Sequence, residues 1–253
     1  ASVPPPARAP TGCQLATAPN TSAMSLQRSE PGGPLVLTYF QLWAKGPAAA
    51  LALAHSGLDW RGEFPTPSWA EVKPTTPWGE LPTLQIPGVG TIGHEAAILT
   101  YIGSLSPNIG GASPKEFTDS LQLSCEAEDI YLKLGKLQDT LYVKGKVPKE
   151  EVEAFWSNSD AKVHNKGQGL AVYLTQLEAF HGACGAGEGR FTASGVSAGE
   201  CKLFATLRML KMIKDDVLAP YPALTAFYAR FEAEPETQDF ILTGGKFPAP
   251  LPQ

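Results

Sequence analysis

Cysteine and histidine are scarce in this chain of 253 residues, which has four of each. The cysteines lie far apart and form no C-x-x-C pair, at Cys13, Cys125, Cys184 and Cys201. The histidines have no partner four residues away, at His55, His94, His164 and His181. Zinc sites and disulfide frameworks need closer spacings than these. The sequence therefore predicts no metal site, and it predicts cysteines that are reduced and buried.

An excess of basic residues and long apolar runs are also lacking. The formal net charge is −5 and the isoelectric point is about 5.4, so binding would release few counterions from nucleic acid and gain little from an anionic membrane surface. No apolar run reaches the roughly 18 residues that a membrane helix needs. With 43% hydrophobic residues, the composition is typical of a soluble globular protein that has neither kind of partner.

Residues 1–34 hold seven of the 23 prolines and a single acidic residue, a composition that cannot bury enough apolar surface to fold alone. This arm has three open interpretations: an organellar leader remnant, a segment docked on another protein chain, or a plain flexible tail. Because the chain starts at Ala1, we expect a processed precursor. The expected location is then either the cytoplasm or an organelle such as a plastid or mitochondrion.

Residues 35–105 alternate strand-like and helix-like patterns. "LVLTYF" is apolar on both faces, as a central strand requires. "AKGPAAALALAHSGLDW" predicts a helix with Pro47 in its first turn and Gly57 at its end. "LDWRGEF" is a second strand, a short helix follows from Ser68, "TLQIPGVGTIG" is a hairpin, and "HEAAILTYIGSL" is a one-sided helix. The order predicts a mixed sheet with helical cover in a small α/β domain.

From residue 113 to about residue 240 the patterns are helical, after a linker "SPNIGGASP". Two capping boxes, "SPKE" from Ser113 and "SAGE" from Ser197, predict helix starts. A further helix is expected over residues 149–181, with breaks near 158 and 167, and another after the "YP" at 221–222. The chain thus predicts an α/β domain, an all-helical bundle and a short tail over residues 241–253.

In the order of its elements and in several short sequence stretches, the chain resembles the cytosolic glutathione transferases, and most closely their sigma- and mu-like tyrosine classes. The resemblance covers residues 35–240 and rests on four stretches: "LTYF", "SWAEVKPTTPWGELPTL", "AAILTYI" and "YPALTAFYARFEAEP". It implies a thioredoxin-like N-terminal domain, a helical C-terminal domain, and glutathione as co-substrate with no metal.

The resemblance also implies roles for individual residues. Tyr39 falls at the family's catalytic tyrosine, whose hydroxyl donates a hydrogen bond to the glutathione sulfur and favours the thiolate. Lys45 falls where the family often has an arginine near that sulfur. Trp69 and Lys73 match the tryptophan and lysine that contact the glycyl end. By themselves, Tyr39 and Trp69 would equally suit packing, and Lys73 a solvated surface.

The "ELPTL" stretch is identified as the glutathione-docking edge, formed by Glu80, Leu81 and Pro82. In the family this proline is cis, which exposes the backbone of the preceding residue to an extended peptide. The next helix would point its N-terminus at the γ-glutamyl carboxylate. There the family has Gln or Glu followed by Ser, but this chain has His94 and Glu95. Glu95 would either repel that carboxylate or contact the α-ammonium instead.

The leading hypothesis is an enzyme that conjugates glutathione to small hydrophobic electrophiles, with an apolar second site between the domains, as in detoxification. A non-catalytic subunit of a larger protein assembly, such as one in an organelle, is the alternative, since fold does not fix function. A glutathione-dependent isomerase, similar to the sigma-like prostaglandin enzymes, would use the same residues. Expected partners are glutathione, the electrophile, and a second copy or another protein contacted by the arm.

Overall fold

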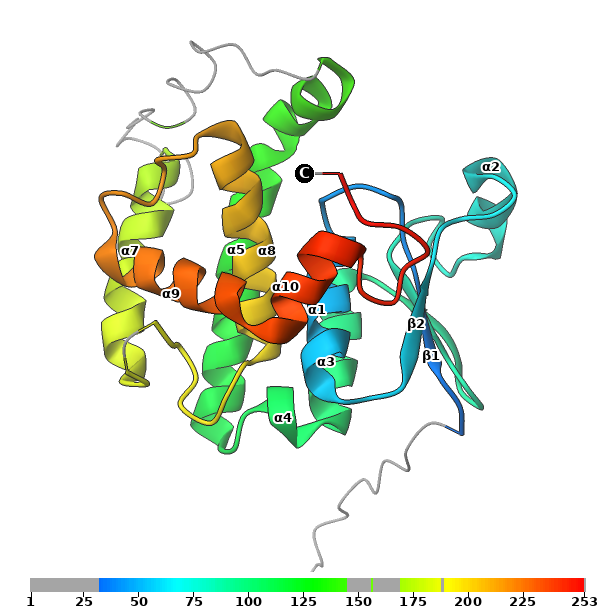
Figure 1. Ribbon diagram of the computed structural model, residues 1–253, viewed down its shortest axis with the longest axis horizontal. Coiled ribbons are helices and arrows are strands. Elements are labelled where there is room, and N and C mark those ends of the chain that lie inside the picture. The colour runs from blue at the N-terminus through cyan, green and yellow to red at the C-terminus, as the bar shows by residue number, and fades with distance from the viewer. Residues whose placement is uncertain (1–31, 145–155, 157–168, 188, 253) are drawn as a thin grey trace, which may run out of the picture.

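The computed structural model describes residues 32–144, 156, 169–187 and 189–252. It has a small sheet on one side and a group of helices on the other (Figure 1). Most of the N-terminal arm, and most of the helix expected from residue 149, lie outside the described residues. Within the described part, no helix combines the length and the hydropathy that crossing a bilayer requires.

Four short strands form the sheet, in the order β2-β1-β3-β4. They are β1 (Leu35–Thr38), β2 (Trp60–Glu63), β3 (Thr83–Ile86) and β4 (Gly90–Gly93). The β1 and β2 strands are parallel, whereas β3 is antiparallel to both β1 and β4. The sheet is therefore mixed, as the sequence predicts, and β1 lies inside it, which explains why both of its faces are apolar.

Two helices cover the face of the sheet that looks toward the bundle, α1 (Gly46–Ser56) and α3 (Glu95–Leu105). The expected signals hold: Pro47 lies in the first turn of α1, and Gly57 ends the helix in the left-handed conformation, with φ of 73°. Between β2 and β3 lie α2 (Trp69–Val72), capped by the Ser68 side chain, and a 3₁₀ turn, η1 (Lys73–Thr75). The Leu81–Pro82 peptide bond is cis, as the resemblance implies.

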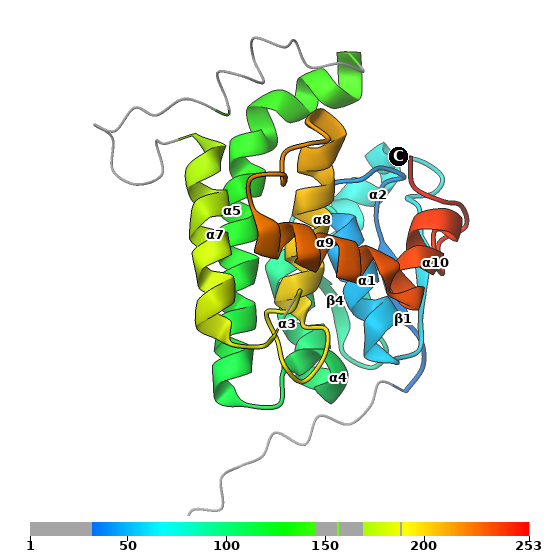
Figure 2. The same ribbon diagram turned by 60° about the vertical axis from the view of Figure 1, so that its left-hand side comes forward.

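The helical part begins with α4 (Pro107–Gly110), a short helix inside the stretch that the sequence predicts as a linker. The long helices α5 (Pro114–Lys144), α7 (Leu170–Cys184) and α8 (Ala198–Ile213) follow, and α5 lies beside both of the others in Figures 1 and 2. The α9 helix (Pro222–Ala233) crosses them, as Figure 2 shows, and is followed by α10 (Pro235–Thr243). The sequence prediction missed α10, whose "PETQDFILT" follows α9 after one residue.

One of the two predicted capping boxes is complete. Ser197 and Glu200 cap each other's backbone N–H groups at the start of α8. At the start of α5 the Ser113 hydroxyl accepts the N–H of Glu116, but the Glu116 carboxylate bonds Ala112 and Ser194 instead of Ser113. The same sequence pattern therefore makes a reciprocal cap in one helix and a bridge to a distant loop in the other.

The C-terminal segment returns to the sheet. The Lys246 carbonyl accepts the N–H of Gly62 on the outer strand β2, and the Phe247 ring packs directly over Gly62. Further along, the Pro250 carbonyl accepts a hydrogen bond from the Gln41 side chain, two residues after Tyr39. The segment thus covers one edge of the sheet and fixes the loop that follows β1.

Among the described cysteines the expectation of buried thiols is only partly met. Cys201 is buried, Cys184 is half-buried, and Cys125 is exposed on α5. All three are free of disulfides. The prediction of burial is wrong for Cys125 because its helix presents that position to an open cavity, described below.

Candidate functional site

Tyr39 stands at the carboxyl end of β1, and its ring turns back onto the start of α1. Only 4% of the residue is exposed. Its Oη atom accepts the backbone N–H of Lys45 at 2.9 Å, and its ring lies so close to Gly46 that a methyl group there would overlap it. The hydroxyl oxygen thus accepts a hydrogen bond from an N–H group at the helix start, where backbone N–H groups lack helical partners. The hydroxyl proton stays available for a further acceptor.

The environment keeps this hydroxyl protonated. Burial, with the neighbouring Tyr131, raises the pKa of Tyr39 well above its usual value, against the opposing effect of the Lys45 and Gly46 N–H groups. A phenol with a raised pKa is a hydrogen-bond donor at neutral pH and does not act as a base.

A second group of predicted residues surrounds the step before β3. Trp69 begins α2 and packs edge-on against Phe40, at 5.1 Å between ring centroids. Phe40 is the residue that follows Tyr39 in the chain. The Lys73 side chain runs over Gly79, next to Glu80, Leu81 and Pro82. The structure therefore brings Trp69 toward the tyrosine and Lys73 toward the cis-proline step.

His94 forms the entrance to α3. It has φ of 62°, the only positive φ among the described non-glycine residues, and its ring lies 5.4 Å from that of Trp78. Trp78 is 65% exposed and covers Gly93. Strained backbone conformations such as that of His94 concentrate at functional sites. The surface beside the first turn of α3 is therefore a candidate functional surface.

Lys45 and Glu95 belong to an ion network that joins the two parts of the chain. Lys45 bonds Glu128 of α5 at 2.6 Å, and Glu128 also accepts from Lys202 of α8 at 2.9 Å. Lys202 in turn bonds the Glu95 carboxylate, and both of these side chains are only 4% exposed. Both lysine ammonium groups lie 4.9 Å from the ring centroid of Tyr131.

The two carboxylates of the network are shifted in opposite directions. Burial raises the pKa of Glu95 to about 7, more than Lys202 lowers it. Burial also acts on Glu128, but Lys202 and Lys45 together hold its pKa below the usual value. Glu95 therefore changes its charge near neutral pH, whereas Glu128 stays ionised.

Sequence reasoning missed Glu128, Tyr131 and Lys202. Lys202 carried a signal that was available: it stands within a run of α8 whose other residues, from Ala198 to Leu207, are all buried. A buried lysine among mostly apolar neighbours needs a partner. The identity of that partner, Glu95, depends on the packing of distant segments and has no local pattern.

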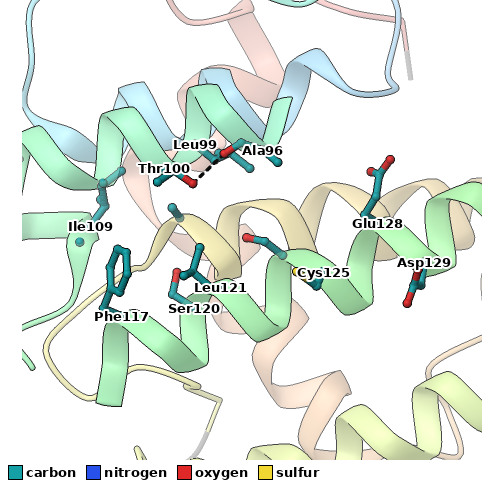
Figure 3. A pocket seen from close by; sticks show the side chains of 14 residues that line it. Ala96, Leu99, Thr100, Ile109, Phe117, Ser120, Leu121, Cys125, Glu128 and Asp129 are labelled. Atoms are coloured by element: carbon teal, nitrogen blue, oxygen red, sulfur yellow. Dashed lines mark hydrogen bonds between the residues drawn. The ribbon is translucent and has the colours of Figure 1, made fainter. Parts of the chain in front are cut away.

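Two cavities meet beside this network. The smaller, of about 120 Å³, is lined by Lys45, His94, Glu95, Ala96, Leu99, Ser124, Glu128 and Lys202. The larger, of about 280 Å³, lies between α3, α4 and α5 and shares Ala96, Leu99, Ser124 and Glu128 with it. In Figure 3, Phe117 and Leu121 of α5 point toward α3 at the apolar end, and Glu128 lies at the other end.

Comparison with known proteins gives consistent matches. A family model described as the glutathione S-transferase C-terminal domain matches residues 149–243. Bovine glutathione S-transferase P is 24% identical over 211 residues, which is 82% of this chain and 91% of that protein. A probable glutathione S-transferase 7 of Caenorhabditis elegans is 34% identical over 67 residues, which is 26% of this chain and 32% of that protein.

Solved structures show the same fold. The Ascaris lumbricoides glutathione S-transferase has a TM-score of 0.67 at 21% identity, covering 82% of this chain and 96% of that one. A rat hPGDS structure with a quinoline has a TM-score of 0.63 at 18% identity, covering 83% and 96%. The chain has the glutathione transferase fold, and its sequence is similar to those of glutathione S-transferases. Its sigma- or mu-like class and the roles of its site residues stay predictions.

Replacing Gly46 with Ala tests the close contact between α1 and the Tyr39 ring. The added methyl would lie about 2.1 Å from a ring carbon, and such overpacking typically costs about 1–3 kcal/mol. We expect Gly46→Ala to lower the free energy of unfolding by that amount in urea denaturation. Gly182→Ala, on α7 with open space around it, is the control and should be neutral or stabilising. Equal stability of the two variants would contradict the contact.

The pKa of Glu95 predicts a pH dependence of stability. Between the ordinary value of 4.5 and about 7, the folded protein holds a proton that the unfolded chain has lost, so this group's contribution falls as pH rises through that window. We expect Glu95→Gln to become more stable relative to wild type from pH 5 to pH 8 in thermal denaturation. Glu116→Gln is the control, since the pKa of Glu116 is lowered. Equal pH slopes for wild type and Glu95→Gln would show that Glu95 stays ionised.

Proposed function

We propose that this chain binds glutathione and catalyses the attack of its thiolate on small hydrophobic electrophiles. The observation that carries the proposal is the Tyr39 hydroxyl, whose oxygen accepts the Lys45 N–H at the start of α1. That contact orients the phenol and leaves its proton for the sulfur. The similarity to glutathione S-transferases from cattle and a nematode supports the same substrate.

The proposed chemistry needs the thiolate, because a free thiol with a pKa near 8.5 is mostly protonated at neutral pH. A hydrogen bond from the neutral Tyr39 hydroxyl would stabilise the thiolate relative to the thiol, with the thiol proton released to solvent. The thiolate sulfur then forms a bond to the electrophilic carbon, whose leaving group or π electrons take the displaced pair. Tyr39 donates throughout and is not itself consumed.

Binding of the tripeptide is assigned to the group around the cis-proline. In this proposal the backbone of Leu81, which precedes β3 and its ladder, pairs with the extended peptide. Lys73 takes the glycyl carboxylate, and Trp69 packs against the same end. Lys45 is held by Glu128, so its charge acts within the network beside the sulfur and not as a free cation.

Tyr39→Phe tests the proposal. A hydrogen bond to a charged group contributes about 1.5–3 kcal/mol, so turnover of a generic aryl halide with glutathione should fall tenfold or more. Tyr228→Phe, which removes a half-buried hydroxyl that bonds Arg208 and Glu232 in the bundle, is the control and should keep its rate. An unchanged rate in Tyr39→Phe, with the fold verified by circular dichroism, would remove Tyr39 from the mechanism.

Two other functions remain as outcomes of that experiment. If wild-type protein shows no turnover and binds no glutathione, the non-catalytic subunit is favoured. If it converts no electrophile but isomerises an endoperoxide in the presence of glutathione, the isomerase is favoured. The isomerase is supported by the similar fold of an hPGDS and of a prostaglandin synthase D.

We also propose that the apolar cavity between α3, α4 and α5 receives a second copy of this chain. Phe117 is 40% exposed and Leu121 is 38% exposed on its rim, and the wall is otherwise formed mostly by small and apolar residues. Contiguous exposed apolar surface marks protein contacts. A helix face from another copy would bury both side chains at once.

Leu121→Glu tests this pairing. The charge would be buried in the contact, so the variant should sediment as a monomer while wild type sediments as a dimer. Leu242→Glu changes an equally apolar but more exposed position on α10, at 69% exposure, and should leave the dimer intact. A wild-type monomer, or a Leu121→Glu dimer, would contradict the proposal.

A further inference from the structure

The C-terminal loop, residues 244–252, is folded tightly on itself. Gly244 follows α10 with φ of 86°, and its carbonyl accepts the N–H of Phe247 at 3.1 Å. A methyl group on Gly244 would lie 2.4 Å from the Ala249 carbonyl oxygen, so this turn requires glycine. The loop therefore has a defined shape, with Phe247 and Leu251 both buried.

One end of the C-terminal loop holds the segment that follows β2. The Phe247 ring packs over Gly62 and stacks on the ring of Phe64, with 5.4 Å between the two ring centroids. Stacking at such a distance stabilises aromatic pairs beyond the burial of their surface. Phe64 is the first residue after β2, and the chain then runs to Ser68, which caps α2. The loop thus fixes the approach to the helix that begins with Trp69.

The other end of the C-terminal loop holds the segment between β1 and α1. The Gln41 side chain, which is exposed, donates a hydrogen bond to the Pro250 carbonyl at 3.0 Å. This segment starts after Tyr39 and ends at Lys45, whose N–H group donates to the Tyr39 hydroxyl. Gln41 therefore ties the segment of the candidate catalytic tyrosine to a part of the chain 209 positions away.

The two segments leave the sheet side by side. Since β1 and β2 are parallel neighbours, their carboxyl ends lie at the same edge of the sheet, where ligands bind in sheets of this kind. The contact between Phe40 and Trp69 joins the two segments once. The C-terminal loop joins them a second time, through Gln41 and Phe64. Two separate links restrict the relative position of the segments more than one link does.

We propose that the C-terminal loop is a positioning element of the candidate site, which sets the place of Tyr39 relative to Trp69 and Lys73. The inference rests on the proposed function, because the roles of those three residues are assigned there. Gln41 and Phe247 are positioning residues that act through the segments they hold. A misplacement of about 1 Å costs roughly a hundredfold in rate when reacting groups must be aligned, so small shifts of these segments matter.

The first measurement is amide hydrogen exchange, read at single residues in the full chain. Gln41→Met keeps the length of the side chain and removes the donor, whereas Phe247→Leu removes the ring and keeps an apolar cover. We expect exchange about threefold or more faster over residues 42–46 in Gln41→Met, and over residues 69–73 in Phe247→Leu, because each segment opens more often without its link. Leu242→Met, at an exposed position of α10, is the control and should exchange like wild type.

The second measurement is steady-state kinetics with glutathione and an aryl halide. In Gln41→Met, kcat should fall about threefold or more with little change in the KM for glutathione, and the pH midpoint of kcat/KM should rise, because Tyr39 then stabilises the thiolate less well. In Phe247→Leu, the KM for glutathione should rise by a similar factor while that midpoint stays. A mere loss of folded protein would lower kcat in both variants and change neither KM nor the midpoint, and that pattern would contradict the inference.

The outcomes separate this inference from the proposed function. If wild type shows no turnover with glutathione, the proposed function fails and hydrogen exchange alone decides: faster exchange in both segments supports the positioning role, and wild-type exchange overturns it. If wild type turns over and both variants match its kinetic constants, the inference is overturned and the proposed function stands. The kinetic split together with faster exchange supports both.

Discussion

The ion pair between Lys202 and Glu95 is the contact on which the arrangement of the site depends. It links the N-terminal half of α8 to the first turn of α3, and through Glu128 it reaches Lys45 ahead of α1. One lysine thus positions the entrances of two helices that flank Tyr39. Breaking a buried pair by removing one partner is strongly destabilising, since it leaves an unpaired charge, so these four side chains are expected to behave as one unit.

A buried ion network of this kind contributes little net stability. Stability alone therefore does not explain why the chain has these charged residues. An apolar pair of similar volume would often stabilise the fold as well or better. What an apolar pair does not offer is a carboxylate with one oxygen fixed and the other free beside a cavity. The buried pair therefore places a polar oxygen of Glu95 beside the cavity, where the low local dielectric strengthens its interaction with any charge nearby.

The fold was largely predictable from local patterns. The Pro47 and Gly57 signals place α1, the "IPGVG" turn places the hairpin, and the Ser197 box places α8. Two features were not predicted correctly. The α10 helix was missed because it follows α9 too closely to leave a loop signal. The capping box at Ser113 was predicted in full, but only the Ser113 hydroxyl makes its expected bond. In the latter, Glu116 has a better partner in Ser194, 78 residues away, and tertiary contacts of that kind have no local signature.

The candidate site was predictable only where one segment defines it. Tyr39, Trp69, Lys73 and the cis Leu81–Pro82 step lie within two short stretches. The structure packs Trp69 against Phe40, the neighbour of Tyr39, and lays the Lys73 side chain over Gly79, close to the cis step. Glu95 shows the limit. In the sequence alone, Glu95 is a negative charge at a position suited to binding an anion. In the structure its carboxylate is paired with the ammonium group of Lys202. The sign of the field that a ligand meets is therefore set by a residue 107 positions away, and only the packing of α3 against α8 establishes it.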